Sequence, residues 1–293
     1  MDPTRRATLA GLLAILLWSS LALLTVATDG LPPFQVLAIA FAVAGMLGLG
    51  RAAWRGRDGW AELRQPAAAL ALSTAALFGY HALYFIALKR APAVEANLLN
   101  YLWPLLIVVF AGFLPGVRIR PLQWIGTVLG LAAAVLLVTG GQRLTVSASH
   151  LPGYLAAIAA AVIWAAYSVL NRRHAQVPSA AITVACLGVA GLGAIAHLVS
   201  ERSVAPSAPQ WGALLLMGLG PTGAAFWLWD TGTKRGDIAL LGSLSYLAPL
   251  LSTVLLVASG RAQPHPVQAV AIALLLAGAW LSTRSRSQAR SEG

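Results

Sequence analysis

The sequence predicts an all-α polytopic membrane protein in which ten transmembrane helices form two inverted repeats of five. Three observations support this fold class. Hydrophobic residues make up 58% of the 293 residues and charged residues only 10%, with a mean hydropathy of +0.76. The apolar residues are grouped in ten stretches, and residues of the first half recur in the second half at a fixed distance. A soluble domain carries about 25% charged residues and a disordered chain has low hydrophobicity, so both classes are excluded.

Each apolar stretch is long enough to cross the hydrocarbon core of a bilayer, which takes about 20 helical residues. The first stretch follows Arg5 and Arg6 as a cleaved signal would. Its length of 19 residues exceeds the roughly 7–15 of a signal core, so we interpret it as a retained span. The connections are too short to hold a soluble domain. In chain order the predicted spans are Leu9–Ala27, Pro33–Gly50, Ala67–Leu88, Val94–Leu114, Pro121–Thr139, Pro152–Leu170, Ala180–Val199, Gln210–Trp229, Ile238–Ala258 and Val267–Thr283.

The basic residues predict the orientation of these spans. With a cytoplasmic N-terminus, 15 of the 20 Lys and Arg residues fall on the cytoplasmic side, as the positive-inside rule requires. Both termini are therefore expected in the cytoplasm, including a tail at 285–293. This bias accounts for the net charge of +11. No run combines basic with interleaved aromatic residues, so we expect no nucleic-acid partner.

An offset of 145 residues relates the two halves of the chain. Identical residues recur at this offset, among them Lys89 and Lys234, Arg90 and Arg235, Tyr101 and Tyr246, and Pro104 and Pro249. We assign residues 1–143 to the first repeat and 150–284 to the second. Five spans are an odd number, so the second copy enters the membrane from the opposite side. Inverted repeats of this kind are typical of secondary transporters, although a duplicated scaffold that transports nothing would share the pattern.

Polar residues form matching stripes in spans 4 and 9. Asn97, Asn100, Tyr101 and Pro104 share one helix face, because their spacing is that of successive turns. Ser245, Tyr246 and Pro249 recur at the equivalent positions of span 9. Two such stripes are suited to lining a cavity for a small amphipathic solute; hydrogen bonding between helices is the alternative.

Further aromatic and polar residues lie inside spans, where an interfacial aromatic belt would not place them. With the stripes they complete the candidate substrate-binding set: Trp18, Tyr80, His81, Tyr84, Trp103, Trp164, Tyr167 and Trp227. Helix packing is the alternative for the tryptophans. His81 could titrate in a proton-linked cycle or be a satisfied interior histidine. Prolines that interrupt spans are candidate hinges: Pro104, Pro221 and Pro249.

Acidic residues are scarce within the spans. Glu95 and Asp230 lie close to helix ends, and no carboxylate lies near a midplane. We therefore expect no interior charge pair and a substrate held mainly by uncharged groups, with Asn97, Asn100 and Ser245 as polar contacts. The sequence has no nucleophile–base pair, metal-ligand cluster or phosphate loop, and its one cysteine, Cys186, lies in an apolar stretch. These features predict no enzyme, cofactor or metal.

Several runs resemble the drug/metabolite transporter superfamily and its EamA repeats over nearly the whole chain. They are Trp18-Ser19-Ser20, YFIALKRAP at 84–92, WDTGTKRGD at 229–237 and GSLSYLAP at 242–249. The last two are most similar to amino-acid exporters of this superfamily. The resemblance implies export of aromatic and other neutral amino acids across an inner membrane by alternating access, through a cavity formed by spans 1, 3, 4, 6, 8 and 9. Ser19 and Ser20 stand where small multidrug members carry a carboxylate, which puts cation/proton antiport in doubt.

Two alternatives to amino-acid export remain open at this point. One is a broad drug or metabolite exporter, and the other is a membrane enzyme or scaffold that transports nothing. The sequence indicates small-molecule and lipid partners and no particular oligomeric state.

Overall fold

The computed structural model describes residues 2–142 and 147–291, with side chains as far as Thr283. Within them, ten helical segments are long and apolar enough to cross a membrane, and no strand is present. The predicted fold class and number of spans are confirmed. Residues 1 and 143 of the predicted first repeat, and 292–293 of the predicted tail, lie outside the described residues. Spans 1 to 10 are Pro3–Ala27, Pro33–Trp54, Ala67–Arg90, Ala93–Ala111, Pro121–Thr139, Ala148–His174, Ser179–Ser200, Ala208–Arg235, Ile238–Ala258 and Pro266–Thr283.

Six spans are built on one continuous α-helix each, and four are divided. The continuous helices are α3 (Pro33–Trp54), α5 (Ala67–Arg90), α8 (Pro121–Thr139), α9 (Leu151–Leu170), α10 (Ile182–Ser200) and α15 (Pro266–Ser291). The divided spans are α1 (Pro3–Trp18) with α2 (Leu21–Ala27), α6 (Ala93–Asn100) with α7 (Trp103–Ala111), α11 (Ala208–Leu219) with η4 (Gly220–Ala224) and α12 (Ala225–Arg235), and α13 (Ile238–Leu244) with α14 (Leu247–Ala258). The remaining short helices are α4 (Gly56–Leu63), η1 (Ala148–His150), η2 (Asn171–His174) and η3 (Ser179–Ala181).

The four interruptions have local causes. Proline lacks the N–H that bonds the carbonyl four residues earlier, so a helix often breaks in the turn before it. Span 4 breaks just before Pro104 and span 9 just before Pro249, while span 8 takes a π-helical turn, η4, around Pro221. In span 1 the Ser19 hydroxyl donates to the Ile15 carbonyl at 3.0 Å, a contact that bends helices.

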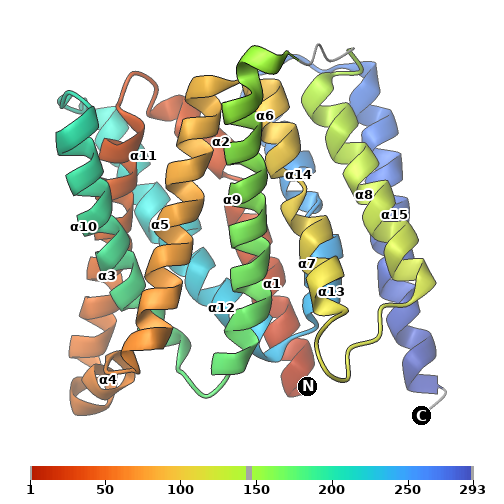
Figure 1. Cartoon of the computed structure of the whole chain (residues 1–293), viewed down its shortest axis with the longest axis horizontal. Helices are drawn as coiled ribbons and strands as arrows, with labels where there is room; N and C mark the ends of the chain where they lie inside the picture. Colours follow the sequence, from red (N-terminus) through yellow and green to blue (C-terminus); the bar gives the residue numbers. More distant parts are fainter. Residues whose placement is uncertain (1, 143–146, 292–293) are drawn as a thin grey trace.

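The helices of the two halves interleave. Both termini lie at the lower edge in Figure 1, which we call the terminal edge. α1 starts at this edge and α9 starts at the opposite edge, so the first helices of the two halves run in opposite directions. The most extensive interfaces are those of α8 with α15, α3 with α10, α5 with α9 and α1 with α12. These are the span pairs 5 and 10, 2 and 7, 3 and 6, and 1 and 8. If every span is replaced by its equivalent in the other half, five places away, the same four pairs result.

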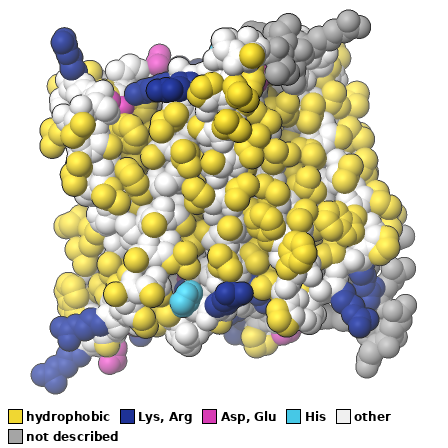
Figure 2. All heavy atoms as spheres, in the orientation of Figure 1, with side chains coloured by type: hydrophobic (Ala, Val, Ile, Leu, Met, Phe, Trp, Pro, Cys, Tyr) yellow, Lys and Arg dark blue, Asp and Glu magenta, His cyan; other side chains and the backbone are white. Residues whose placement is uncertain are grey.

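The surface has the distribution expected of a membrane protein. Hydrophobic side chains cover the broad middle band of the face in Figure 2, and Lys and Arg gather towards its two edges. Spans 1, 3, 4, 6, 8 and 9 meet between the flanking pairs α3–α10 and α8–α15 (Figure 1). Their packing is close: a Cβ atom on Gly232 of α12 would lie 2.7 Å from Cα of Gly11 in α1.

Candidate functional site

Five aromatic residues from four spans meet at the centre of the molecule and form what we call the central aromatic cluster. Trp18, at the end of α1, is at its middle. Its ring centroid lies 5.0 Å from that of Trp229, 5.6 Å from Trp164, 5.7 Å from Phe226 and 6.3 Å from Trp103. Most of these pairs meet edge to face or tilted, the arrangement that the ring quadrupoles favour. The cluster therefore joins spans 1, 4, 6 and 8.

A polar wall borders the cluster on α5 and α6. The amide of Asn100 donates to the Tyr80 hydroxyl at 3.2 Å, and the Tyr84 hydroxyl donates to the side-chain oxygen of Asn97. The rings of Tyr80 and Tyr84 are nearly parallel, and Tyr80 lies 5.5 Å from Trp164. Asn100 is buried, and its Oδ1 has no hydrogen-bond partner among the described residues. An unused acceptor therefore lies beside the aromatic rings.

The interruption of span 8 contributes directly to the cluster. Trp18 Nε1 donates to the carbonyl of Pro221 at 3.0 Å. Pro221 lies in the π-helical turn η4, where the Thr222 hydroxyl also donates back to Met217 O of α11 at 2.8 Å. Turns of this kind are frequent at functional sites. The bond ties span 1 to span 8.

His81 and Tyr167 lie at the rim of the cluster. His81 Nδ1 donates to the Leu77 carbonyl at 2.7 Å, and the imidazole ring packs 5.2 Å from Phe41. This is the environment of a satisfied interior histidine, the second of the two interpretations. The Tyr167 hydroxyl donates to Ser73 Oγ at 3.4 Å, near the start of α5 and away from the cluster.

The two tyrosines related by the 145-residue offset have different surroundings. Tyr101 lies in the break between α6 and α7, directly after Asn100 of the polar wall, and is half-buried. Tyr246 is fully buried. A Cβ atom on Gly130 of α8 would lie 2.5 Å from its ring. Tyr246 therefore packs against α8, and Tyr101 belongs with the polar wall.

Two more predicted site residues lie apart from the cluster. The Ser245 hydroxyl is buried and donates to the Leu241 carbonyl of its own helix at 2.7 Å. Trp227 is 38% exposed, and the guanidinium of Arg51 lies 5.2 Å from its ring centroid. The structure brings together the other predicted site residues and leaves these two, with Tyr246, at separate positions.

The structure corrects the expectation that no interior charge pair exists. Asp230 Oδ2 and Lys234 Nζ lie 2.9 Å apart on α12, with side chains only 3% and 4% exposed. Asn171 Nδ2 donates to Asp230 Oδ1 at 2.7 Å, and Lys234 Nζ donates to Val177 O at 3.1 Å. The predicted span ends at residue 229, whereas α12 continues to Arg235 in contact with η2 and η3. The spacing of four residues between opposite charges was the signal that the sequence offered.

A second charged group lies at the opposite edge. The Glu201 carboxylate accepts bonds from the backbone N–H of Phe34 at 3.1 and 3.2 Å and faces His197 Nδ1 at 2.9 Å. Lys89 Nζ lies 3.8 Å away, but its side chain is 54% exposed. This group ties the start of α3 to the ends of α5 and α10 and is more open than the pair at the terminal edge.

Glu95, the other carboxylate noted near a helix end, is buried and accepts a bond from the Tyr154 hydroxyl at 2.6 Å. It lies in the first turn of α6, away from the polar wall. Within the residues that the structure describes, no group of three His, Cys, Asp or Glu side chains could hold a metal ion.

Ten apolar helices in two similar halves, with aromatic and amide groups gathered between them, define a multi-pass α-helical membrane protein with an aromatic and polar interior. The EamA-like transporter family model matches residues 5–139 and 151–284. The chain therefore belongs to the EamA-like transporter family, and carries two copies of its domain.

Named relatives match over most of the chain. The chain is 49% identical over 280 residues to the aromatic amino acid exporter YddG of Ancylobacter novellus, covering 94% of this chain and 96% of that protein. It is 28% identical to the protein of the same name from Escherichia coli, covering 86% and 87%. A solved crystal structure matches with a TM-score of 0.92 and 47% identity, covering 97% of this chain and 98% of its own.

Proposed function

We propose that this chain is a secondary transporter that exports aromatic and other neutral amino acids, and that it is not an enzyme. The names of its relatives support the substrate class. The observation that carries the proposal is the polar wall beside the central aromatic cluster. An aromatic amino acid has the same two parts, a ring and a polar head.

Each part of such a substrate finds a chemical partner at the site. A ring can stack against the tryptophans, with about 0.5–1.5 kcal/mol per aromatic pair beyond the burial of area. Asn100 Oδ1 offers a buried acceptor to an ammonium N–H, and buried acceptors without partners are rare in proteins. We assign this role to Asn100, with Tyr80, Tyr84 and Asn97 as the polar neighbours.

Burial differs on the two sides of the cluster. Tyr80, Tyr84 and Tyr101 are partly exposed, whereas Asp230 and Lys234, towards the terminal edge, are buried. We infer that this conformation admits substrate from the opposite edge and is closed at the terminal edge. If the two inverted halves exchanged their conformations, the site would open at the terminal edge and close at the opposite edge. Switching between these two states is alternating access.

Orientation in the cell follows from the basic residues. We place the terminal edge in the cytoplasm and the protein in the inner membrane of a bacterium. The two termini and the connections between spans at this edge together carry 15 of the 20 Lys and Arg residues, as the positive-inside rule describes. The closed side is then cytoplasmic and the accessible side periplasmic.

Flux through purified protein in liposomes tests the proposal. We expect labelled L-phenylalanine, L-tyrosine and L-tryptophan to exchange across the membrane faster than in protein-free liposomes, and unlabelled aromatic amino acids to compete. A panel of lipophilic drug cations serves as the comparison. Transport of the cations with no amino-acid flux would favour the broad drug exporter instead.

A further inference from the structure

We propose that Asp230 and Lys234 form a recognition site at the cytoplasmic mouth for the two charges of a free α-amino acid, its ammonium at Asp230 and its carboxylate at Lys234. This inference rests on the proposed function and extends it, because it assigns a second binding site between the cytoplasm and the central aromatic cluster. It also predicts what the transporter rejects: analogues that lack either charge.

The position of the pair is the first support. Trp164, Tyr167, Ser168 and Asn171 share one face of span 6, because they are spaced at successive turns. This face begins in the central aromatic cluster and ends where Asn171 donates to Asp230 at 2.7 Å. A line of polar and aromatic groups therefore leads from the cluster to the pair.

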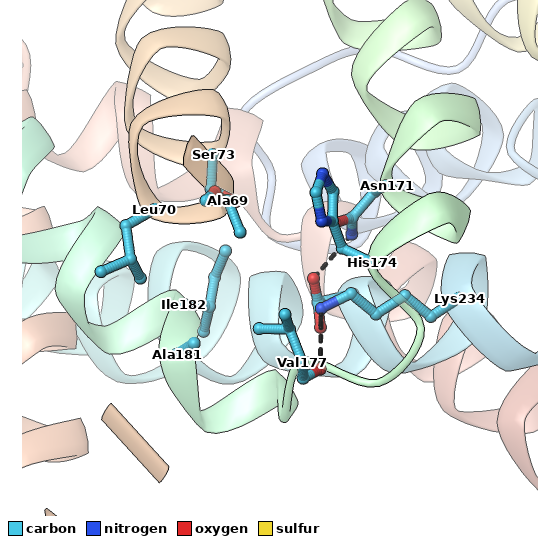
Figure 3. Close-up of a pocket in the computed structure, with 10 residues that line it drawn as sticks. Ala69, Leu70, Ser73, Asn171, His174, Val177, Ala181, Ile182 and Lys234 are labelled. Atoms are coloured by element: carbon cyan, nitrogen blue, oxygen red, sulfur yellow. Dashed lines mark hydrogen bonds and ion pairs between the residues drawn. The ribbon is translucent and has the colours of Figure 1, made fainter. Parts of the chain in front are cut away.

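The other side of this line is on spans 3 and 8. The Tyr167 hydroxyl donates to Ser73 of α5, and Trp229 Nε1 donates to Ser168 Oγ at 3.1 Å. Ser73, Asn171, Asp230 and Lys234 all line one small cavity (Figure 3). Charged and polar groups of three spans thus face a common space below the cluster.

The chemistry of the pair is the second support. Asp230 Oδ2 lies 2.9 Å from Lys234 Nζ, and Asn171 donates to the other carboxylate oxygen, Oδ1. A zwitterion can insert between Asp230 and Lys234. The ammonium of the substrate then pairs with the carboxylate of Asp230, and the carboxylate of the substrate pairs with the ammonium of Lys234. Every buried charge then keeps an opposite charge. A molecule with only one charge leaves one residue unpaired in a buried place, which is strongly unfavourable.

The cavity is closed in this conformation. Its volume is about 10 Å³, which is at most enough for about one water molecule and far too small for an amino acid. Val177, whose carbonyl accepts from Lys234, and Asn171 lie on the η2–η3 side of the cavity, as Figure 3 shows. Admission of substrate therefore requires the η2–η3 segment to separate from α12.

The opposite edge lacks an equivalent site. The 145-residue offset relates Asp230 to Phe85 and Lys234 to Lys89, so the carboxylate has no counterpart there. Lys89 is half-exposed and reaches Glu201 of span 7 instead of a residue on its own helix. Recognition of both charges is accordingly confined to one side, the side from which an exporter takes its substrate.

The competing account is that the pair only holds α12 in place. Three probes with the same ring separate the accounts: L-phenylalanine, 2-phenylethylamine, which lacks the carboxylate, and 3-phenylpropionate, which lacks the ammonium. Uptake is measured in vesicles of both orientations, so that entry at the cytoplasmic face is distinguished from entry at the periplasmic face.

We expect the wild-type protein to take up both analogues at least about tenfold more slowly than L-phenylalanine at the cytoplasmic face. In Asp230→Asn the KM for L-phenylalanine rises at this face, and 3-phenylpropionate loses most of its disadvantage. In Lys234→Gln the KM for L-phenylalanine also rises at this face, and here 2-phenylethylamine is the analogue that loses most of its disadvantage. At the periplasmic face the KM values change by much less.

Arg172→Gln is the matched control. Arg172 ties the same junction together, donating to Thr233 O at 2.8 Å and Gly236 O at 2.9 Å, without contacting the pair. The Arg172→Gln substitution should lower thermal stability and leave the ratios between the uptake rates of the three probes unchanged. If the pair variants also lower all three fluxes in proportion to folded protein, with KM values unchanged, the pair is only structural.

The wild-type protein alone gives a second test, independent of whether variants fold. Equal uptake of all three probes at the cytoplasmic face would overturn the inference while leaving amino-acid transport in place. Absence of L-phenylalanine flux in both orientations would overturn the proposed function and this inference with it.

Discussion

Tyr101 and Tyr246 show how symmetry-related residues diverge in a single conformation. Tyr101 is half-buried beside the polar wall, whereas Tyr246 is fully enclosed between α8, α14 and α15. The residues that pack around Tyr246 are Ala133, Ala134, Leu250, Ala271 and Leu275. The same residue type thus fills a helix interface in one half and borders the candidate site in the other.

This difference gives opposite expectations for truncation. Tyr246→Ala removes a large buried ring and should reduce stability by about 3–5 kcal/mol, the usual cost for an aromatic residue in a core. Tyr101→Ala should reduce stability much less and lower amino-acid flux per folded molecule. Thermal unfolding in detergent and liposome flux measure the two effects, with Tyr101→Phe and Tyr246→Phe as controls. Equal losses of stability in both Ala variants would contradict this assignment.

Prediction from sequence was most successful for side chains inside spans. The indoles and phenols of Trp18, Tyr80 and Trp164 could be placed in the interior because an interfacial belt would not lie at such depths. Trp229 and Asp230 were placed at a helix end because hydropathy falls off at the charged residues that follow. Trp229 is buried in the central aromatic cluster, and Asp230 is buried where η2 and η3 contact α12; both are tertiary contacts.

At the scale of helices, the interruptions and close crossings decide how the site is built. The prolines of spans 4, 8 and 9 predicted three of the four interruptions. The break in span 1 was not predicted, because serine hydroxyls bend a helix only when they bond back to its own carbonyls, as Ser19 and Ser20 do. Close helix crossings depend on tertiary packing and could be located only in the structure.

The crossing of α1 and α12 predicts a sensitive glycine. In Gly232→Ala the new Cβ would meet the backbone of Gly11 at 2.7 Å, so the helices must separate, at about 1–3 kcal/mol. Gly191→Ala in α10 is the control, because a Cβ there has nothing within 4 Å and alanine favours a helix over glycine by roughly 0.5–1 kcal/mol. In thermal unfolding, the melting temperature of Gly232→Ala should be well below that of Gly191→Ala. The reverse ranking would mean that this crossing is looser than described.

For the whole molecule, the ten spans follow from hydropathy, and charge predicts which side of the membrane holds the termini. Both kinds of signal are summed over long segments, so errors of a few residues at helix ends do not alter them. The pairing of helices is different. The contact of α5 with α9, or of α1 with α12, depends on which small and aromatic faces fit together in three dimensions.

The proposed orientation predicts the outcome of reporter fusions. Alkaline phosphatase, which is active only outside the cytoplasm, should be active when fused within the connection at 201–207 and inactive within 55–66 or at the C-terminus. The basis is the gathering of Lys and Arg at the terminal edge. Activity of the C-terminal fusion would invert the assignment of the closed face to the cytoplasm.

The interleaving of the two halves also has a consequence for biosynthesis. Each of the four most extensive helix interfaces joins a helix of residues 5–139 to one of residues 151–284. Because chains emerge from the ribosome N-terminus first, the first five spans enter the bilayer before any of their main partners exist. They must wait there as loosely associated helices, with their small and polar faces towards lipid or towards insertion factors. The main helix interfaces of this protein therefore form only near the end of translation, and a chain that stops after residue 139 lacks all four of them.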